Sequence, residues 1–234
     1  MQAVILAGGM AKRLGPLTKD LPKSMLEIKG RPFLEYQLEL LKENGITEIL
    51  LCLGHLSDRI KSHFSDGSNF GVRLTYSTEP EKLLGTGGAL RNAYELLQDE
   101  FLVTYGDSYL DFSYKDFIGQ FRRGDSRALM AVYKNLNRWD KSNVVLQDDR
   151  VVVYDKKISQ AGMDYIDAGA LILAKEVVNQ IPENQFHDLE SVLKTLVSRR
   201  QLRAFRLQSR FYEIGSAQGL EEFSQLIESK LSYT

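Results

Sequence analysis

The fold is decided by the stretch Val4-Ile5-Leu6-Ala7-Gly8-Gly9-Met10-Ala11-Lys12-Arg13-Leu14. Its apolar start is typical of a strand that helices bury on both faces, as in a parallel sheet. The two glycines allow unusual backbone dihedrals and leave room for a ligand close to the main chain. Successive amides in such a turn form an anion site, to which Lys12 and Arg13 add positive charge. The stretch predicts a phosphate-binding loop, with a nucleoside triphosphate as the simplest ligand. An ordinary glycine turn with two solvated basic residues is the alternative.

The composition is typical of a soluble globular protein. Of 234 residues, 43% are hydrophobic and 26% are charged, and the net charge is −1, so nothing favours a nucleic-acid or membrane-surface partner. No stretch approaches the roughly 18–20 apolar residues that span a bilayer, and the N-terminus lacks the basic region of a signal peptide. The lone Cys52 excludes an intrachain disulfide. We therefore expect a single cytoplasmic domain over residues 1–234, and whether it forms a homo-oligomer stays open.

Apolar patterns and turn signals alternate between helices and strands along the chain. Helices are expected at residues 32–43, 57–64 with Ser57 as N-cap, 89–97, 111–123, 188–199 capped by His187 and Asp188, and 217–231. Strands are expected at residues 48–53, 72–76 at a sheet edge, 101–105, 128–133 and 165–173, and a hairpin at 143–154. This order predicts an α/β, Rossmann-like, doubly wound fold with a mostly parallel mixed sheet. Ligands of such sheets bind at the carboxyl ends of the strands.

Two further segments have the chemistry of a nucleotide site. The glycine-rich segment Gly85-Thr86-Gly87-Gly88 leads into a helix, whose N-terminus can point amides at a ligand. A loop that needs small residues for packing is the alternative. Asp107 follows a buried strand, where a hard cation that bridges phosphate oxygens would need an oxygen ligand. A turn cap is the ordinary explanation for such an aspartate.

The spaced motifs together resemble those of the sugar-phosphate nucleotidyltransferases. In that family the first strand runs into L-A-G-G-x-x-x-R-L and the next segment carries P-K-P-M. The chain has Leu6-Ala7-Gly8-Gly9, then Arg13-Leu14, then Pro22-Lys23-Ser24-Met25, with Ser24 in place of the second proline. The resemblance implies a glycosyltransferase-A-like nucleotidyltransferase fold and an enzyme that uses Mg²⁺. Its substrates would be a nucleoside triphosphate and a sugar 1-phosphate, and its products a nucleoside diphosphate sugar and pyrophosphate.

The resemblance also implies roles on the nucleotide side. The expected nucleotide-binding residues are Leu6, Ala7, Gly8, Gly9, Arg13, Lys23, Glu79, Gly85, Thr86, Gly87 and Gly88. Arg13 and Lys23 are the expected catalytic residues. Arg13 would hold the β- and γ-phosphates, because a fork of donors matches phosphate oxygens. Lys23 would lie across the α-phosphate and the attacking sugar phosphate, where it offsets charge in the transition state.

On the acceptor side the motifs depart further from the family. Asp155-Lys156 resembles the family's E-K-P, whose lysine faces the acceptor phosphate, and Asp167-Ala168-Gly169 resembles N-A-G, which contacts sugar hydroxyls. The expected substrate-binding residues are Asp107, Asn143, Lys156, Asp167 and Gly169. Residues 211–216 are similar to W-x-D-x-G-T, with Glu213 in place of the aspartate. Asp107 and Glu213 would therefore hold Mg²⁺, and the longer glutamate would bind it directly or through water.

Several alternatives remain open from the sequence. A dinucleotide-dependent oxidoreductase is disfavoured, because the first glycine loop lacks the G-x-G-x-x-G spacing. A non-catalytic, nucleotide-sensing relative would have the same fold. Within the family, the closest overall resemblance is to the heptose 1-phosphate guanylyltransferases, which use GTP, and the muramate 1-phosphate uridylyltransferases are also similar. Uridylyl- and cytidylyltransferases acting on other sugar phosphates or on non-sugar phosphates share the motifs.

Overall fold

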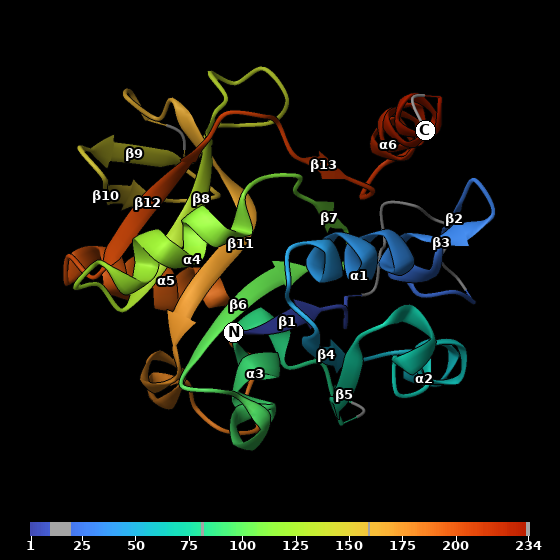
Figure 1. Cartoon of the computed structure of the whole chain (residues 1–234). Coiled ribbons are helices and arrows are strands. Elements are labelled where there is room, and N and C mark those ends of the chain that lie inside the picture. The colour runs from blue at the N-terminus through green and yellow to red at the C-terminus, as the bar shows by residue number, and fades with distance from the viewer. Residues whose placement is uncertain (10–19, 81, 159, 233–234) are drawn as a thin grey trace.

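The structure is a computed structural model that describes residues 1–9, 20–80, 82–158 and 160–232. Nine strands of this described chain form a central sheet in the order β5-β4-β1-β6-β11-β8-β12-β10-β9 (Figure 1). The strands are β1 (Gln2–Leu6), β4 (Glu48–Leu53), β5 (Arg73–Thr78), β6 (Glu100–Tyr105), β8 (Ala128–Lys134), β9 (Val144–Gln147), β10 (Arg150–Tyr154), β11 (Tyr165–Ala174) and β12 (Leu202–Leu207).

The sheet is parallel in its N-terminal half and mixed beyond it. β5, β4, β1 and β6 run parallel, and β11 then pairs antiparallel with β6 and β8. β12 lies parallel to β8, and the hairpin of β9 and β10 completes the far edge. The predicted α/β fold class is therefore confirmed. β12 was not predicted, because its charged residues interrupt the apolar pattern in LRAFRL.

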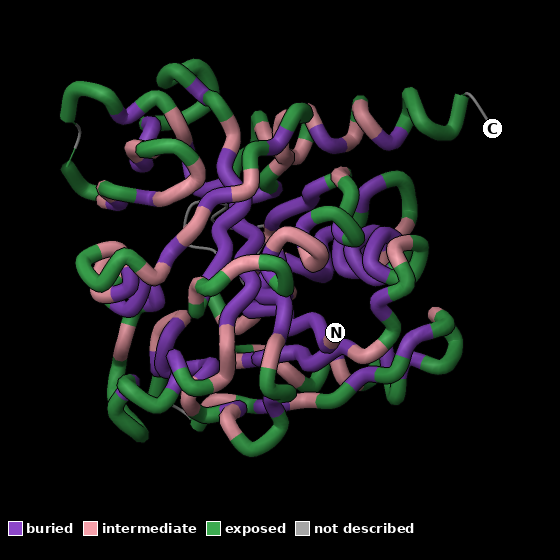
Figure 2. Tube along the Cα trace, turned by 60° about the vertical axis from the view of Figure 1, so that its left-hand side comes forward, coloured by how far each residue is buried: buried purple, intermediate pink, exposed green. Residues whose placement is uncertain are grey.

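Helices cover both faces of the sheet (Figure 1). On one face lie α1 (Phe33–Glu43), α2 (Ser57–Phe64), α4 (Tyr114–Arg122) and α6 (Ala217–Leu231), and on the other lie α3 (Gly85–Asn92) and α5 (Leu189–Ser198). Successive residues of a strand point to opposite faces, so Ala3 and Ile5 enter one apolar core while Val4 and Leu6 enter the other. Figure 2 shows this buried interior surrounded by exposed turns. In the described chain, no helix is both long enough and apolar enough to span a membrane.

Short elements complete the chain between these strands and helices. They are the 3₁₀ turns η2 (Lys23–Met25), η3 (Ser68–Phe70), η4 (Tyr94–Leu96) and η5 (Lys175–Gln180), and the two-residue strands β2 (Glu27–Ile28), β3 (Arg31–Pro32), β7 (Ser108–Tyr109) and β13 (Tyr212–Glu213). β13 pairs antiparallel with β7. This pairing joins the segment before α6 to the carboxyl end of β6.

Several predicted helix ends are wrong. The helix expected at residues 89–97 begins at Gly85 and ends at Asn92, so the glycine-rich segment forms its first turn. The helix expected from residue 111 begins at Tyr114, because the Ser113 side chain accepts a hydrogen bond from the Asp116 amide. Ser57 is not the N-cap of α2. The residue at that position is Leu56, in the left-handed conformation at φ 61°.

The capping of α5 also differs from the prediction. Asp188 occupies the N-cap position, but its side chain accepts no capping hydrogen bond. The hydroxyl of Thr86 instead accepts a hydrogen bond from the Leu189 amide at 2.9 Å. Because these two residues are 103 positions apart in sequence, local sequence patterns could not have indicated this cap.

Candidate active site

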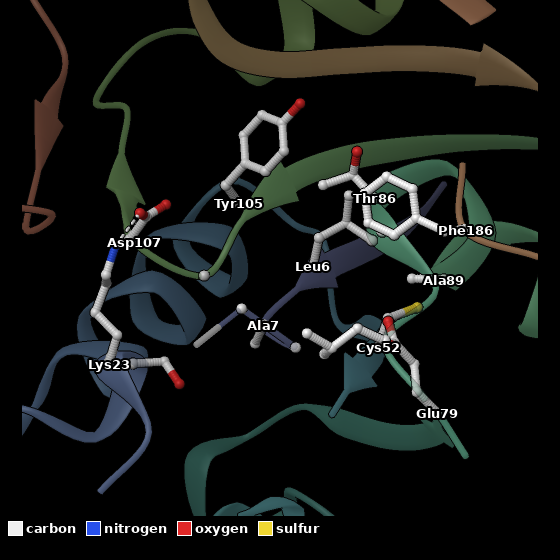
Figure 3. A pocket seen from close by; sticks show the side chains of 16 residues that line it. Leu6, Ala7, Lys23, Cys52, Glu79, Thr86, Ala89, Tyr105, Asp107 and Phe186 are labelled. Carbon is white, nitrogen blue, oxygen red and sulfur yellow. Dashed lines mark hydrogen bonds and ion pairs between the residues drawn. The ribbon is translucent and has the colours of Figure 1, made fainter. Parts of the chain in front are cut away.

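A pocket of about 250 Å³ lies at the carboxyl ends of β1, β4 and β6 (Figure 3). The position agrees with the rule for open α/β sheets. It is lined by eight of the predicted nucleotide-binding residues, which are Leu6, Ala7, Gly8, Gly9, Lys23, Glu79, Gly85 and Thr86. Asp107 lines it as well. Arg13 lies outside the described residues, so its role stays a prediction.

The first glycine loop packs closely against two neighbouring strand ends. A Cβ atom added to Gly54 would lie 2.8 Å from the carbonyl oxygen of Gly8, and one added to Gly106 would lie 2.8 Å from the Cβ of Ala7. Both glycines directly follow a buried strand, β4 and β6. Sequence reasoning missed their role, although a glycine directly after each buried strand was a usable signal.

One end of the pocket combines apolar surface with a carboxylate. The Phe186 ring is part of the pocket wall near Thr86 and is 59% exposed (Figure 3). Glu79 is half-buried, and its Oε2 accepts a hydrogen bond from the Leu84 amide at 3.1 Å. Burial raises the pKa of Glu79. This end therefore offers an aromatic face beside a hydrogen-bond acceptor.

The amides of Gly87 and Gly88 have hydrogen-bond partners within the protein. Their amides donate hydrogen bonds to the carbonyl oxygen of His187, at 2.8 and 3.0 Å, and both residues are buried. A Cβ at Gly87 would lie 2.9 Å from the same oxygen. These two amides therefore bind α3 to the chain before α5, and the nucleotide-binding role of Gly87 and Gly88 stays a prediction. Gly85 and Thr86 remain at the pocket surface.

At the opposite end, Lys23 and Asp107 form an ion pair (Figure 3). The Lys23 Nζ lies 2.6 Å from the Asp107 Oδ2, and the lysine side chain is 16% exposed. Lys23 comes from η2, and Asp107 follows the carboxyl end of β6. The structure thus brings together two residues that the sequence had assigned separately to phosphate and metal binding.

Glu213 lies beside this pair. β13 sets Glu213 opposite Ser108, and the Ile214 amide donates to the Asp107 carbonyl oxygen at 2.9 Å. Partial desolvation by the surrounding protein atoms, and then the negative charge of Asp107, raise the pKa of Glu213 to about 7. Part of the residue nevertheless remains exposed to solvent, and water there screens part of both effects. The mutual repulsion of the two carboxylates is the condition that a bound cation relieves.

The two carboxylates fit a hard divalent cation that takes its other ligands from elsewhere. Within the described ranges, no group of three or more histidine, cysteine, aspartate or glutamate side chains could hold a metal ion. Magnesium commonly binds through one or two carboxylates and completes its shell with water and substrate phosphates. Asp107 and Glu213 match that donor set.

On the acceptor side, Lys156 lies next to Tyr105. Its Nζ is 5.5 Å from the centroid of the Tyr105 ring and 3.3 Å from the Asp167 Oδ2. Burial alone would lower the pKa of Lys156, but the Asp167 carboxylate, together with Tyr105 and Glu213, raises that pKa. Lys156 is therefore a protonated ammonium group that Asp167 holds in place.

Asp167 is part of a buried hydrogen-bond network. Its side chain is only 1% exposed. Besides Lys156, its carboxylate accepts hydrogen bonds from the Tyr154 hydroxyl at 2.9 Å and the Gly169 amide at 3.0 Å. Asn143 is also buried, and its Oδ1 accepts from the Asp167 amide at 2.9 Å. These polar groups are thus bonded to one another below the surface, and the role of Asn143, Asp167 and Gly169 in sugar binding stays a prediction.

Two further residues, Tyr105 and Phe186, were also missed by sequence reasoning. Tyr105 ends β6 and lines the pocket beside Asp107, and burial raises the pKa of its phenol to about 12. The strand-end rule that singled out Asp107 could have indicated it. Phe186 precedes α5, far along the chain from the glycine loops, and no motif marked it.

Comparisons with known proteins agree with this geometry. Residues 2–230 match the family model described as Nucleotidyl transferase. D-glycero-alpha-D-manno-heptose 1-phosphate guanylyltransferase from Campylobacter jejuni is 31% identical over 217 residues, which cover 92% of this chain and 95% of that protein. N-acetylmuramate alpha-1-phosphate uridylyltransferase from Neisseria meningitidis serogroup B is 39% identical over 127 residues, or 54% of each chain. The crystal structure of HddC from Yersinia pseudotuberculosis complexed with GMP-PN has a TM-score of 0.79 and 26% identity, covering 97% of this chain and 99% of that one.

Proposed function

The chain belongs to the nucleotidyl transferase family and is an enzyme, and we propose that it transfers GMP from GTP to a heptose 1-phosphate. An oxygen of the acceptor phosphate bonds to the α-phosphorus of GTP. The bond between that phosphorus and the oxygen bridging to the β-phosphate breaks, and pyrophosphate leaves with the bonding electrons. The products are a GDP-sugar and pyrophosphate.

The observation that supports this proposal is that the two ends of the pocket differ in chemistry. Phe186 and Glu79 lie at one end and the Lys23–Asp107 pair at the other, with Leu6 and Ala7 between them (Figure 3). A nucleotide fits this layout in one direction, with its base against the aromatic ring and its α-phosphate beside the lysine. Stacking of a base on an aromatic ring contributes about 1–3 kcal/mol.

Glu79 favours guanine over the other bases. A carboxylate only accepts hydrogen bonds, and guanine presents two adjacent donors, N1–H and the exocyclic amino group. Uracil presents one N–H between two carbonyl oxygens, which a carboxylate would repel. One Glu79 oxygen accepts from Leu84, but a carboxylate has about four acceptor positions. Its remaining acceptor positions are therefore available to a guanine edge.

In the transfer step, Lys23 stabilises charge that develops on the α-phosphate. Asp107 and Glu213 would hold Mg²⁺, which would neutralise phosphate charge. Lys156, kept protonated by Asp167, binds the acceptor phosphate and sets it in line with the α-phosphorus. Arg13 would bind the β- and γ-phosphates as the sequence motif implies. The enzyme supplies position and charge, and needs no nucleophile of its own.

The choice of acceptor rests on relatives. The Campylobacter jejuni relative that covers nearly the whole chain is named as a heptose 1-phosphate guanylyltransferase. The Neisseria meningitidis uridylyltransferase matches only about half of the chain. Heptose 1-phosphate with GTP is therefore the first pair to test, and muramate 1-phosphate with UTP is the main competitor.

The test is pyrophosphate release in the presence of Mg²⁺. Each nucleoside triphosphate is tested against the 1-phosphates of heptose, mannose, glucose and muramate. We expect release that needs GTP and is fastest with heptose 1-phosphate. Turnover with UTP and not GTP would contradict the guanine assignment. Absence of turnover with every pair, while GTP still binds by calorimetry, would identify a nucleotide-binding protein without this activity.

A Glu79→Gln variant tests base recognition separately. Its amide would place a donor against the donors of guanine, so we expect kcat/KM for GTP to fall about 10–100-fold, as for a mismatched base contact of about 1–3 kcal/mol. Glu95→Gln makes the same chemical change at an exposed position in η4, outside the pocket, and should leave kcat/KM unchanged. Equal kinetics for both variants would remove Glu79 from base recognition.

A further inference from the structure

A second cavity, of about 160 Å³, has Glu213 in its lining. We call it the Trp139 pocket. Its lining residues come from the loop after β8 and from the chain that runs from the end of β12 through β13 into α6. Trp139, Asp140, Arg210, Glu213, Gln218 and Glu222 are among its lining residues. Glu213 thus belongs to this pocket, and it is also close enough to Asp107 and Lys156 for their charges to act on its carboxylate.

The pocket has fixed walls. The Arg210 guanidinium carbon lies 3.8 Å from the centroid of the Trp139 ring and 4.6 Å from that of Tyr212. The same guanidinium forms an ion pair with Glu222. The other carboxylate oxygen of Glu222 accepts a hydrogen bond from the side-chain Nε2 of Gln218 at 2.9 Å. Arg210 is therefore held by two rings and a carboxylate.

The loop that carries Trp139 is also held rigidly. Asn135 is fully buried, and its Oδ1 accepts a hydrogen bond from the Trp139 amide at 3.2 Å. Its Nδ2 donates to the Asp140 carbonyl oxygen at 2.6 Å and to the Ser142 hydroxyl at 3.1 Å. Despite this support the Trp139 side chain is 52% exposed. A buried network that presents an exposed indole is suited to ligand contact.

The chemistry of the lining suits a polyhydroxylated chain. Hydroxyl groups can accept from the guanidinium of Arg210 and donate to the carboxylates of Asp140 and Glu222, while carbon-bound hydrogens pack on the indole. A second phosphate suits it poorly, because Glu222 neutralises Arg210 and further carboxylates of Asp140 and Glu213 line the same space.

We propose that the Trp139 pocket binds the exocyclic polyol end of the acceptor sugar, opposite its phosphate, and selects the acceptor by the length of that end. This inference rests on the proposed function, since it takes the acceptor to be a sugar 1-phosphate. A heptose carries one more hydroxylated carbon beyond its ring than a hexose of the same configuration. That extra carbon would contact Trp139 and Arg210.

The chain offers a direct probe of occupancy. Trp139 is its only tryptophan, so intrinsic tryptophan fluorescence reports on this pocket alone. We expect a saturable change on titration with heptose 1-phosphate and a change at least fivefold smaller with mannose 1-phosphate, which lacks the extra carbon. Equal changes with both sugars, or none with heptose 1-phosphate, would overturn the inference.

Kinetics of two variants supply a second readout. Trp139→Ala should raise KM for heptose 1-phosphate about tenfold, while KM for mannose 1-phosphate and for GTP stay within twofold. Trp139→Phe keeps a ring and should retain most of the selectivity, with folding checked by circular dichroism. Equal rises for both sugars, or none, would contradict a polyol site. If the wild-type protein releases no pyrophosphate, the proposed function fails, and the fluorescence titration by itself then supports or overturns the inference.

Discussion

Replacing Lys23 by methionine tests the catalytic centre most directly. Methionine is similar in length but has no charge and cannot donate a hydrogen bond. The Lys23 ammonium group is 2.6 Å from Asp107 and largely shielded from water, so solvent cannot take its place readily. Loss of one preorganised donor to a transition-state charge costs about 2.7–4 kcal/mol, which corresponds to a fall in kcat of about 10²–10³.

The same substitution should shift the pH dependence. Burial and Asp107 raise the pKa of Glu213 to about 7, and Lys23 is one of the cations that limit this rise. Removing a cation disfavours the carboxylate, so the pKa of Glu213 rises further in the variant. If activity needs the ionised form, the acidic limb of the rate profile moves to higher pH.

The assay is steady-state pyrophosphate release over a range of GTP and acceptor concentrations, which gives kcat and KM, with the Kd of GTP measured by calorimetry. Lys29→Met is the matched control. Lys29 lies on the surface in the turn between β2 and β3, where it forms an ion pair with Glu228 of α6. We expect its kcat to stay within twofold of the wild type. A Lys23→Met enzyme with kcat within tenfold of the wild type would refute the reasoning. A change confined to KM would likewise mean that Lys23 binds substrate and transition state equally.

Three other predictions concern the framework of the site. Phe117→Ala removes a fully buried ring of the α4 face and should lower the free energy of unfolding by about 3–5 kcal/mol in urea titrations; a loss below 1 kcal/mol would contradict close packing there. Gly54→Ala puts a methyl group 2.8 Å from the Gly8 carbonyl oxygen and should lower the free energy of unfolding by about 1–3 kcal/mol. Gly9→Ala, which has nothing within 4 Å of the added methyl group, should leave the free energy of unfolding almost unchanged. Hydrogen bonds from Lys194 and backbone amides lower the pKa of Asp155 to about 2, so its contribution to stability is present at pH 7 and is lost as pH falls from about 4 through about 2. Asp155→Asn should therefore lower Tm at pH 7 by calorimetry, and a difference from the wild type that persisted undiminished at pH 2 would contradict this.

Much of the framework could be predicted from the sequence because it depends on local patterns. The strands at residues 48–53 and 101–105 are continuous apolar runs, as burial under helices on both faces requires. The first glycine loop and Asp107 follow such strands, so the strand-end rule placed them at one edge before the structure was considered. The helix at residues 217–231 follows its apolar periodicity and has the predicted bounds.

Helix ends and polar contacts depended on partners distant in sequence. α3 begins four residues earlier than expected because its first turn packs on the chain before α5, where the amides of Gly87 and Gly88 meet His187. Asp167 has the spacing of a sugar-binding residue but is buried between Tyr154 and Lys156. Spacing along a strand fixes which face a side chain occupies, and it does not reveal which other strands cover that face.

The sequence by itself determined the α/β class, the glycine loops and the identities of the charged groups that could bind phosphate and metal. Only the tertiary structure decided which of them meet. Lys23 and Asp107 are 84 residues apart, and Trp139 and Arg210 come from different loops. Periodicity and turn chemistry are properties of short segments, whereas a contact between loops depends on how the crossovers bring the ends of separate strands to one edge.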